Sequence, residues 1–357
     1  MFFKKSGNSC RERTSHLQSL SINHILWALS LLFRAFLTIL APAGCSSIIA
    51  PEQNPPVVIS KAPLHQPEPS AGNTCLDILI FEDDRLGRLD AYQRISEFDS
   101  DIAYVESTGG KKIIFFCTSG PYYRHEWRRI NSYSALYQMR AELRHESREF
   151  LTRTAECRTT AGDRYGTAVL KPLTCKIQID AISYDFSGTP YSNSHITDLK
   201  AYLINVNSSC PLTCSSPEKP VQIINHGRLS PEDINSMTEP DLVYSHLTDK
   251  LEGGRMQPVS DFICMPNHGT EGNPGNPPTR LVLEGVIDGH TYYWPVNVGS
   301  DKGKGTYLAE RGCCYAYDIH IRRKGTSDPD IPVSTSTGEI KLNVKSWIEK
   351  TEYGIEF

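Results

Sequence analysis

The sequence predicts an all-β protein with a few short helices, organised as two β-sandwich domains. Short apolar or alternating segments recur at intervals of about 8–12 residues, a spacing typical of sandwiches. Turns rich in Gly and Pro, of which the chain has 25 and 23, separate these segments. The length of 357 residues agrees with two domains of about 150 residues each.

The first 44 residues predict a signal peptide, residues 1–44. A basic stretch that includes Lys4 and Arg13 precedes the apolar run Ile25–Leu40, and small residues lead to Cys45. A cysteine after such a run is the residue that bacterial lipoproteins acylate, so Cys45 is the predicted lipidation site. More than one acyl chain would hold the protein stably on a membrane. The alternative is an uncleaved membrane helix, because the apolar run is near the lower length limit for spanning.

A spacer follows the signal at residues 45–72. This segment has six prolines and almost no apolar periodicity. Pro-rich chain is extended and semi-rigid, so the spacer would hold the domains away from a membrane surface. Beyond residue 44 the chain has 32 basic and 40 acidic residues, a net charge of −8. An acidic body without a stripe of Lys and Arg argues against a nucleic-acid partner.

The N-terminal domain is predicted at residues 73–210. Cys75–Phe81 and Ile113–Cys117 are apolar runs that predict buried strands. Leu173–Ala181 alternates apolar and polar residues, which places one face in a core and the other in water. Ser132 is a plausible N-cap for a helix with Leu136, Met139 and Leu143 on one face.

The C-terminal domain is predicted at residues 211–357. Its clearest element is a hairpin of Arg280–Ile287 and His290–Val298, because Asp288-Gly289 suits the positive φ angles of a type I′ turn. Ser230 would cap a short helix whose first residue is Pro231. The run from Tyr315 to Ile321 alternates, and Ile340–Val344 forms a last strand.

Eleven cysteines are present, of which Cys10 would leave with the signal and Cys45 would carry lipid. Nine cysteines remain, which is an odd number, and no CxxC pair occurs. We therefore expect most of these nine to be buried thiols. Those inside apolar runs are Cys75, Cys117, Cys175, Cys264 and Cys314. Only Cys210 and Cys214 are close enough in sequence to suggest a local disulfide in an exported chain.

The sequence contains no motif that indicates an enzyme. His145-Glu146 starts like a zinc-binding helix but lacks the second His, and neither a GxSxG elbow nor a P-loop occurs. We therefore expect no catalytic residue, no metal, no cofactor and no small-molecule substrate. Asp328 and Asp330 could meet calcium, but a turn suits them better, since Asp bonds its own backbone there.

Several segments, in their order along the chain, carry a family resemblance. They are Cys75–Phe81 with Leu89–Ile95, Trp127–Ser132, Leu173–Phe186, Leu199–Val206, Phe262–Asn267, Thr279–Gly285 and Tyr317–Asp330. With the lipoprotein start, the chain resembles the fimbrillin superfamily of Bacteroidetes and specifically its FimB-type fimbrium anchoring subunits. The resemblance implies two tandem transthyretin-like β-sandwich domains. It also implies a lipoprotein of the outer membrane that fixes a pilus to the cell, with fimbrial stalk subunits as partners joined by strand exchange.

The C-terminal segment is the candidate for the joint, by which we mean the contact where strand exchange would connect this chain to a stalk subunit. Its alternating apolar residues are Ile340, Leu342, Val344, Tyr353, Ile355 and Phe357. Such a segment can add to the exposed sheet edge of a neighbouring subunit. The alternative is an edge strand of the chain's own second domain.

A second functional hypothesis is a surface-tethered module that binds glycans or host molecules. It depends on Tyr292, Tyr293 and Trp294 as a sugar platform. Strand alternation instead places Tyr292 and Trp294 on one face and Tyr293 on the other, which favours core filling.

Overall fold

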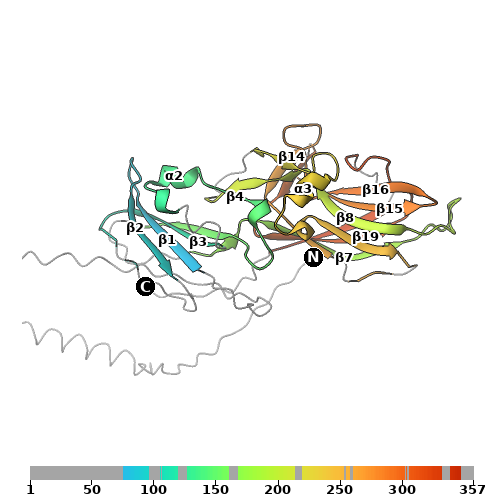
Figure 1. The fold of residues 1–357 in the computed structure, drawn as a ribbon, viewed down its shortest axis with the longest axis horizontal. Helices are drawn as coiled ribbons and strands as arrows, with labels where there is room; N and C mark the ends of the chain where they lie inside the picture. Colours follow the sequence, from blue (N-terminus) through green and yellow to red (C-terminus); the bar gives the residue numbers. More distant parts are fainter. Residues whose placement is uncertain are drawn as a thin grey trace, which may run out of the picture. The chain divides into compact units, whose positions relative to one another are not determined.

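The structure of the chain, a computed structural model, describes residues 75–95, 105, 107–119, 127–160, 168–213, 219–252, 255–257, 260–301, 303, 305–331 and 338–346. All of these residues belong to one compact unit. They form an all-β architecture, since strands account for most of the regular structure and the α-helices α2 and α3 have five residues each (Figure 1). The all-β prediction is confirmed.

The first sheet is antiparallel and has the strand order β2-β1-β3-β5-β6. Its strands are β1 (Cys75–Glu82), β2 (Leu89–Ile95), β3 (Lys112–Ser119), β5 (Arg153–Arg158) and β6 (Lys171–Pro172). Strand β1 is buried on both faces, with Leu79 and Phe81 in the main core and Ile78 in a second cluster. This two-sided burial explains why its sequence is a continuous apolar run rather than an alternating one.

Two four-stranded sheets share the main core. One has the order β12-β8-β15-β16 and the other β13-β7-β19-β20. Their strands are β7 (Cys175–Tyr184), β8 (Thr197–Ile204), β12 (Tyr244–Lys250), β13 (Ser260–Cys264), β15 (Arg280–Ile287), β16 (His290–Asn297), β19 (Cys313–Ile321) and β20 (Gly338–Ser346). Along β7 the residues Cys175, Ile177 and Ile179 are buried while Lys176 and Gln178 are half-buried, as the alternation predicts.

The hairpin prediction is confirmed. Strands β15 and β16 pair antiparallel down to Ile287 opposite His290. The two turn residues Asp288 and Gly289 have φ angles of 51° and 81°. Positive φ at both positions is the type I′ geometry that a two-residue turn needs to match the twist of its strands.

Short elements complete the described chain. They are β4 (Arg140–Glu142), β9 (Val206–Asn207), β10 (Ser209–Pro211), β11 (Ile223–Ile224), β14 (Asn267–Thr270), β17 (Ser300–Asp301), β18 (Thr306–Ala309), α2 (Tyr133–Tyr137), α3 (Pro231–Asn235) and the 3₁₀ turns η2 (Leu143–His145) and η3 (Pro240–Leu242). Among the described helices, none is both long and apolar enough to cross a membrane.

Both predicted helix caps are present, but one helix is shorter than expected. The side chain of Ser132 accepts from the backbone N–H of Ala135, and that of Ser230 accepts from Asp233. Helix α2 ends at Tyr137, so the predicted extension to Leu143 is wrong. Residues 140–142 instead pair with β10, because tertiary strand pairing outweighs a weak helical periodicity.

The division of the chain near residue 210, between domains 73–210 and 211–357, stays a prediction. Strands β7 and β8 precede that position but pair with strands that follow it, β7 with β13 and β19, and β8 with β12 and β15. In Figure 1 these green strands lie among the yellow, orange and red strands of the later sequence. The strand pairing favours an earlier division, between β6 and β7.

Candidate functional site

The last described strand is the first candidate site. Strand β20 pairs antiparallel with β19 through nine register positions, from Ile321 opposite Gly338 to Cys313 opposite Ser346. It is the end strand of its sheet, and no described strand pairs with its outer edge. An edge strand presents unpaired backbone N–H and C=O groups, which is what another chain needs for strand addition.

The predicted joint residues are only partly within the described chain. Ile340, Leu342 and Val344 occupy the register positions opposite Ile319, Tyr317 and Tyr315. These three residues therefore belong to an edge strand of the chain's own sheet, which is the alternative to strand exchange given for this segment. Cys45, Cys214, Tyr353, Ile355 and Phe357 lie outside the described residues, so their roles stay predictions.

Strand β19, the neighbour of β20, holds two buried and hydrogen-bonded tyrosines. Tyr315 and Tyr317 are at most 1% exposed. The hydroxyl of Tyr315 donates to the carbonyl of Leu308 at 3.0 Å and accepts from the backbone N–H of Glu310 at 2.9 Å. The hydroxyl of Tyr317 donates to the carbonyl of Asn297 at 3.2 Å. Burial raises the pKa of both phenols, which therefore remain neutral donors.

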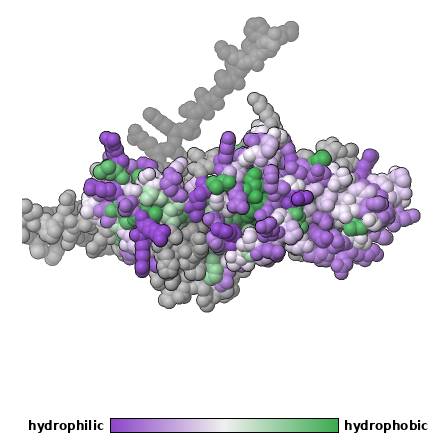
Figure 2. Space-filling view, turned by 45° about the horizontal axis from the view of Figure 1, so that its top comes forward, coloured by the Kyte–Doolittle hydropathy of each residue, from purple (hydrophilic) through white to green (hydrophobic). Residues whose placement is uncertain are grey.

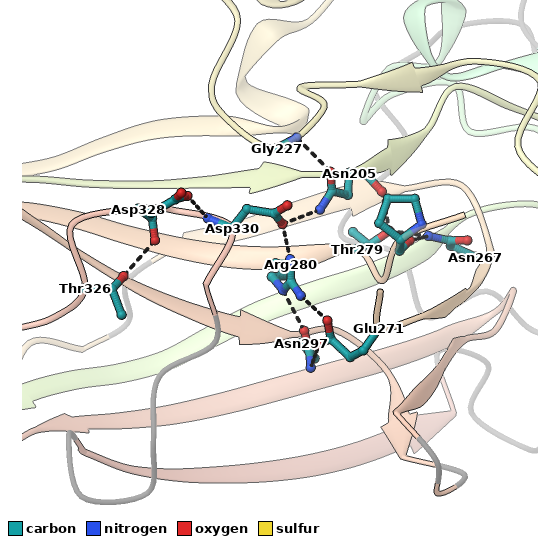
Figure 3. A network of polar contacts seen from close by, with 11 residues as sticks. Asn205, Gly227, Asn267, Glu271, Thr279, Arg280, Asn297, Thr326, Asp328 and Asp330 are labelled. Atoms are coloured by element: carbon teal, nitrogen blue, oxygen red, sulfur yellow. Dashed lines mark hydrogen bonds and ion pairs between the residues drawn. The ribbon is translucent and has the colours of Figure 1, made fainter. Parts of the chain in front are cut away.

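A polar network lies where the chain leaves β19 on its way to β20 (Figure 3). Its centre is Arg280, the first residue of β15, which is 3% exposed. The guanidinium of Arg280 pairs with the carboxylates of Asp330 and Glu271, and its Nε donates to Oδ1 of Asn297 at 2.9 Å. Asn205 donates from Nδ2 to Asp330 at 2.8 Å. A buried cation is thereby paired with two carboxylates and an amide, as burial of charge requires.

This network fastens the segment 326–330 to the sheet of β15 and β16. Thr326 exchanges two backbone hydrogen bonds with Tyr293, at 2.8 and 3.0 Å. The carboxylate of Asp328 accepts from the backbone N–H of Asp330 at 2.8 Å, the turn that the sequence analysis favours over a calcium site. Among the described residues, no group of three or more His, Cys, Asp or Glu side chains could hold a metal ion. The chain is therefore fixed at Asp330, shortly before β20 begins at Gly338.

Sequence reasoning did not single out Arg280 or Asn205. Arg280 and Asp330 are separated by 50 positions, so their pairing leaves no local pattern. Asn205 has a φ of 56°, a left-handed conformation that Asn tolerates better than most residues. An Asn at the end of a strand was therefore the one sequence feature that could have indicated this network.

The aromatic residues of β16 do not form one exposed platform. Trp294 is 2% exposed, and its Nε1 donates to the carbonyl of Arg323 at 3.0 Å. Tyr292 packs against the same main core, whereas Tyr293 packs against a separate cluster around Tyr202. The predicted alternation is confirmed, and it assigns these rings to packing.

The surface offers no broad hydrophobic face in the view of Figure 2, where hydrophobic residues form small separate patches among hydrophilic ones. The large exposed apolar side chains are likewise scattered along the described sequence: Leu86, Tyr92, Tyr137, Val169, Val221 and Ile331. Scattered apolar residues are ordinary at protein surfaces. A backbone edge is consequently a better candidate for a subunit joint than an apolar patch.

The predicted local disulfide is also only half described. Cys210 is buried, and its sulfur lies 3.5 Å from the sulfur of Met265. Because Cys214 lies outside the described residues, a bridge between the two stays a prediction.

These sheets define the chain as an all-β protein of the β-sandwich class. No protein-family model and no curated protein matches the sequence. Among solved structures, the fold is similar to that of the fimbrilin FimA from Porphyromonas gingivalis, with 12% identity, a TM-score of 0.57, and coverage of 84% of this chain and 99% of that chain.

Two further structures have the same likeness. A proposed cell adhesion protein from Bacteroides eggerthii has 17% identity and a TM-score of 0.60, and the match covers 84% of this chain and 97% of that one. The tip fimbrial protein Mfa3 from Porphyromonas gingivalis has 14% identity and a TM-score of 0.51, with 82% and 100% covered. At these identities the likeness concerns the fold, and it agrees with the fimbrillin-type fold that the sequence resemblance implies.

Proposed function

We propose that the chain is a non-enzymatic structural subunit of a cell-surface fimbrium. The observation that carries the proposal is the fold likeness to a fimbrilin, which extends over 84% of this chain and nearly all of that one. A match of this extent means that the described sheets have counterparts in one fimbrial protein rather than in an isolated domain. The sequence segments given under the family resemblance support the same proposal, because they resemble the fimbrillin superfamily.

Within the fimbrium, we assign the chain the role of the anchoring subunit. The support is in the sequence: Cys45 follows a signal-like segment, and the Pro-rich spacer 45–72 separates it from the first strand. Lipid on Cys45 would hold the protein on the outer membrane at its N-terminal end, and the spacer would let the folded unit extend from the surface. The C-terminal end is then available for contact with a stalk subunit.

The proposed joint is the segment that follows β20. Tyr353, Ile355 and Phe357 alternate as a strand does, and alternate side chains of an added strand can fill pockets beside a neighbour's sheet edge. Backbone hydrogen bonds would supply affinity, and the three apolar side chains would supply register.

The test uses the full chain, with an affinity tag inserted in the spacer, recovered from detergent-solubilised outer membranes. Stalk subunits should co-purify with it, and loss of the chain should release fibres to the medium. Deletion of Lys350–Phe357 should leave a folded, lipidated protein that no longer retains stalk subunits. A Cys45→Ala variant should lose both labelling by fatty acid and membrane retention.

Three results would each contradict one part of this proposal. If no fimbrial subunit co-purifies and the isolated chain binds glycans, the chain is a tethered binding module instead. If Cys45→Ala stays in the membrane with residues 1–44 intact, the apolar run is a membrane helix rather than a cleaved signal. Unchanged retention of stalk subunits by the C-terminal deletion, at normal protein levels, would remove that segment from the joint.

A further inference from the structure

Two buried cysteines face each other across neighbouring strands. Cys175 is the first residue of β7 and Cys264 the last residue of β13, and they are direct cross-strand partners in an antiparallel pair. Neither side chain has measurable exposure. Their Sγ atoms lie 3.2 Å apart. The pair is distinct from Cys210 and Cys214, the candidates that sequence proximity suggested.

The geometry is close to that of a disulfide. An S–S bond is about 2.0 Å long, so the two sulfur atoms would have to approach by little more than about 1 Å. Directly opposed Cβ atoms in antiparallel strands are roughly 4.5–5.5 Å apart, and a disulfide requires roughly 3.5–4.5 Å. A small adjustment at the two strand ends is enough. Rotation of one side chain away from the other would instead leave a polar thiol alone in the main core, of which both residues are members.

We propose that Cys175 and Cys264 form an interstrand disulfide in the exported protein. The inference relies on export, which is part of the proposed function, but not on fimbrial assembly. Disulfides form and persist in oxidising compartments such as the cell envelope and surface. The pair would be a modification site of this chain, where the sequence alone predicts two separate buried thiols.

The reaction is thiol–disulfide exchange with a dithiol–disulfide oxidase of the cell envelope. One cysteine thiolate attacks a sulfur of the oxidase disulfide, which forms a mixed disulfide and frees one oxidase thiolate. The second cysteine thiolate then attacks the chain's own sulfur in the mixed disulfide. This step forms the Cys175–Cys264 bond and releases the second oxidase thiolate. The chain loses two electrons to the oxidase, and the two thiol protons end on the reduced oxidase.

The burial of the pair fixes when this exchange happens. The hydrogen bond to Cys264 and burial both raise the pKa of the Cys175 thiol, so in the folded chain Cys175 has little thiolate. An oxidase also cannot contact sulfur atoms with no exposed surface. The bond therefore forms during folding, before β13 closes against β7. Once formed, it is protected from reductants by the same burial.

The disulfide would make the two edges of one sheet unequal. Strand β13 has five residues and is the end strand opposite β20 in the order β13-β7-β19-β20. The bond would link two positions 89 residues apart and tie β13 covalently to β7. At the other edge, the described contacts of β20 with β19 are backbone pairs. The end strand β13 would thus be held to its sheet by a covalent bond, whereas the described contacts of the end strand β20 are backbone pairs alone.

Mass spectrometry of the native protein tests the bond. The full chain is recovered from outer membranes, its free thiols are alkylated, and it is digested with trypsin without reduction. Tryptic peptides 165–176 and 256–280 contain one cysteine each, so a cross-linked pair of these peptides identifies the bond without ambiguity. Alkylation of both peptides, or a link from Cys175 to another cysteine such as Cys313, would overturn the proposal.

Thermal unfolding gives a second readout. A reductant present during folding should lower the unfolding midpoint of the wild-type chain by roughly 5–15 °C. The double variant Cys175→Ala/Cys264→Ala should show no effect of the reductant, whereas Cys157→Ala, at a half-buried cysteine of β5, should keep it. An equal effect on all three chains would contradict the assignment. Failure of the bond would leave co-purification with stalk subunits unaffected, so the two proposals are tested separately.

Discussion

Replacement of Glu146 by Gln should remove a pH-dependent loss of stability. Glu146 follows the turn η2 and is 1% exposed. Its two carboxylate oxygens accept from the backbone N–H and the hydroxyl of Thr152, both at 2.7 Å. Burial raises the pKa of this carboxyl from 4.5 to about 7, although the hydrogen bonds from Thr152 act in the opposite direction.

Proton binding determines whether stability rises or falls with pH. Between pH 4.5 and 7 the folded state keeps a proton on Glu146 that the unfolded state releases, so the free energy of unfolding falls as the pH rises. Stability from this group is fully present below pH 4.5 and is lost as the pH rises through about 7. At about 1.4 kcal/mol per pKa unit, the loss between pH 5 and 8 is roughly 2–3 kcal/mol.

The assay is equilibrium denaturation at several pH values between 5 and 8. Glu146→Gln keeps the shape and can still hydrogen bond to Thr152, but it cannot ionise. Its free energy of unfolding should therefore rise relative to wild type by roughly 2–3 kcal/mol across this range. Glu232→Gln, at an exposed carboxyl of α3, is the matched control and should run parallel to wild type. Parallel curves for Glu146→Gln as well would refute the reasoning.

Two further predictions concern the polar network and the chain division. Asp330→Asn removes one carboxylate from the buried Arg280 but leaves Glu271, so denaturation should show a loss of roughly 1–2 kcal/mol. Hydrogen exchange at 326–331 should become faster. The control Asp249→Asn, at a fully exposed carboxylate, should change neither stability nor this exchange. Unchanged exchange in Asp330→Asn would mean that the network does not fasten this segment. Limited proteolysis should cut the spacer first and then, if anywhere, near 208–219 or 268–278, outside the strands β10 and β14 that these ranges include. Early cuts inside Leu173–Ala181 would contradict the assignment of that stretch to a core strand.

Local chemistry explains which elements could be predicted from the sequence. The two-sided burial of β1, the alternation of β7 and the Asp288-Gly289 turn all depend on residues within a few positions of each other. The caps at Ser132 and Ser230 depend on a backbone donor three residues away. In each case the interaction partner is inside the window in which a pattern can be seen.

Long-range pairing explains what could not be predicted. The parallel pairing of β7 with β19 joins Ile177 to Tyr315, far along the chain, and no periodicity of either strand specifies it. The same holds for Arg280 with Asp330, which lies in the segment after β19, and for Cys175 with Cys264, which sheet register brings together. The site was therefore predictable as a strand near the C-terminus, but not the network that precedes it.

The position of β20 decides how the joint has to be tested. A deletion that begins at Gly338 would remove nine register pairs with β19 and leave that core strand paired only with β7, so loss of stalk binding could result from loss of folding. A deletion that begins at Lys350 leaves every described pair of β20 intact. Loss of stalk binding in that variant, with unchanged thermal unfolding, can only come from the removed residues Tyr353, Ile355, Phe357 and their neighbours. Because Lys350 follows the last described residue of β20, Ser346, this deletion tests the proposed joint separately from the strand that pairs with β19.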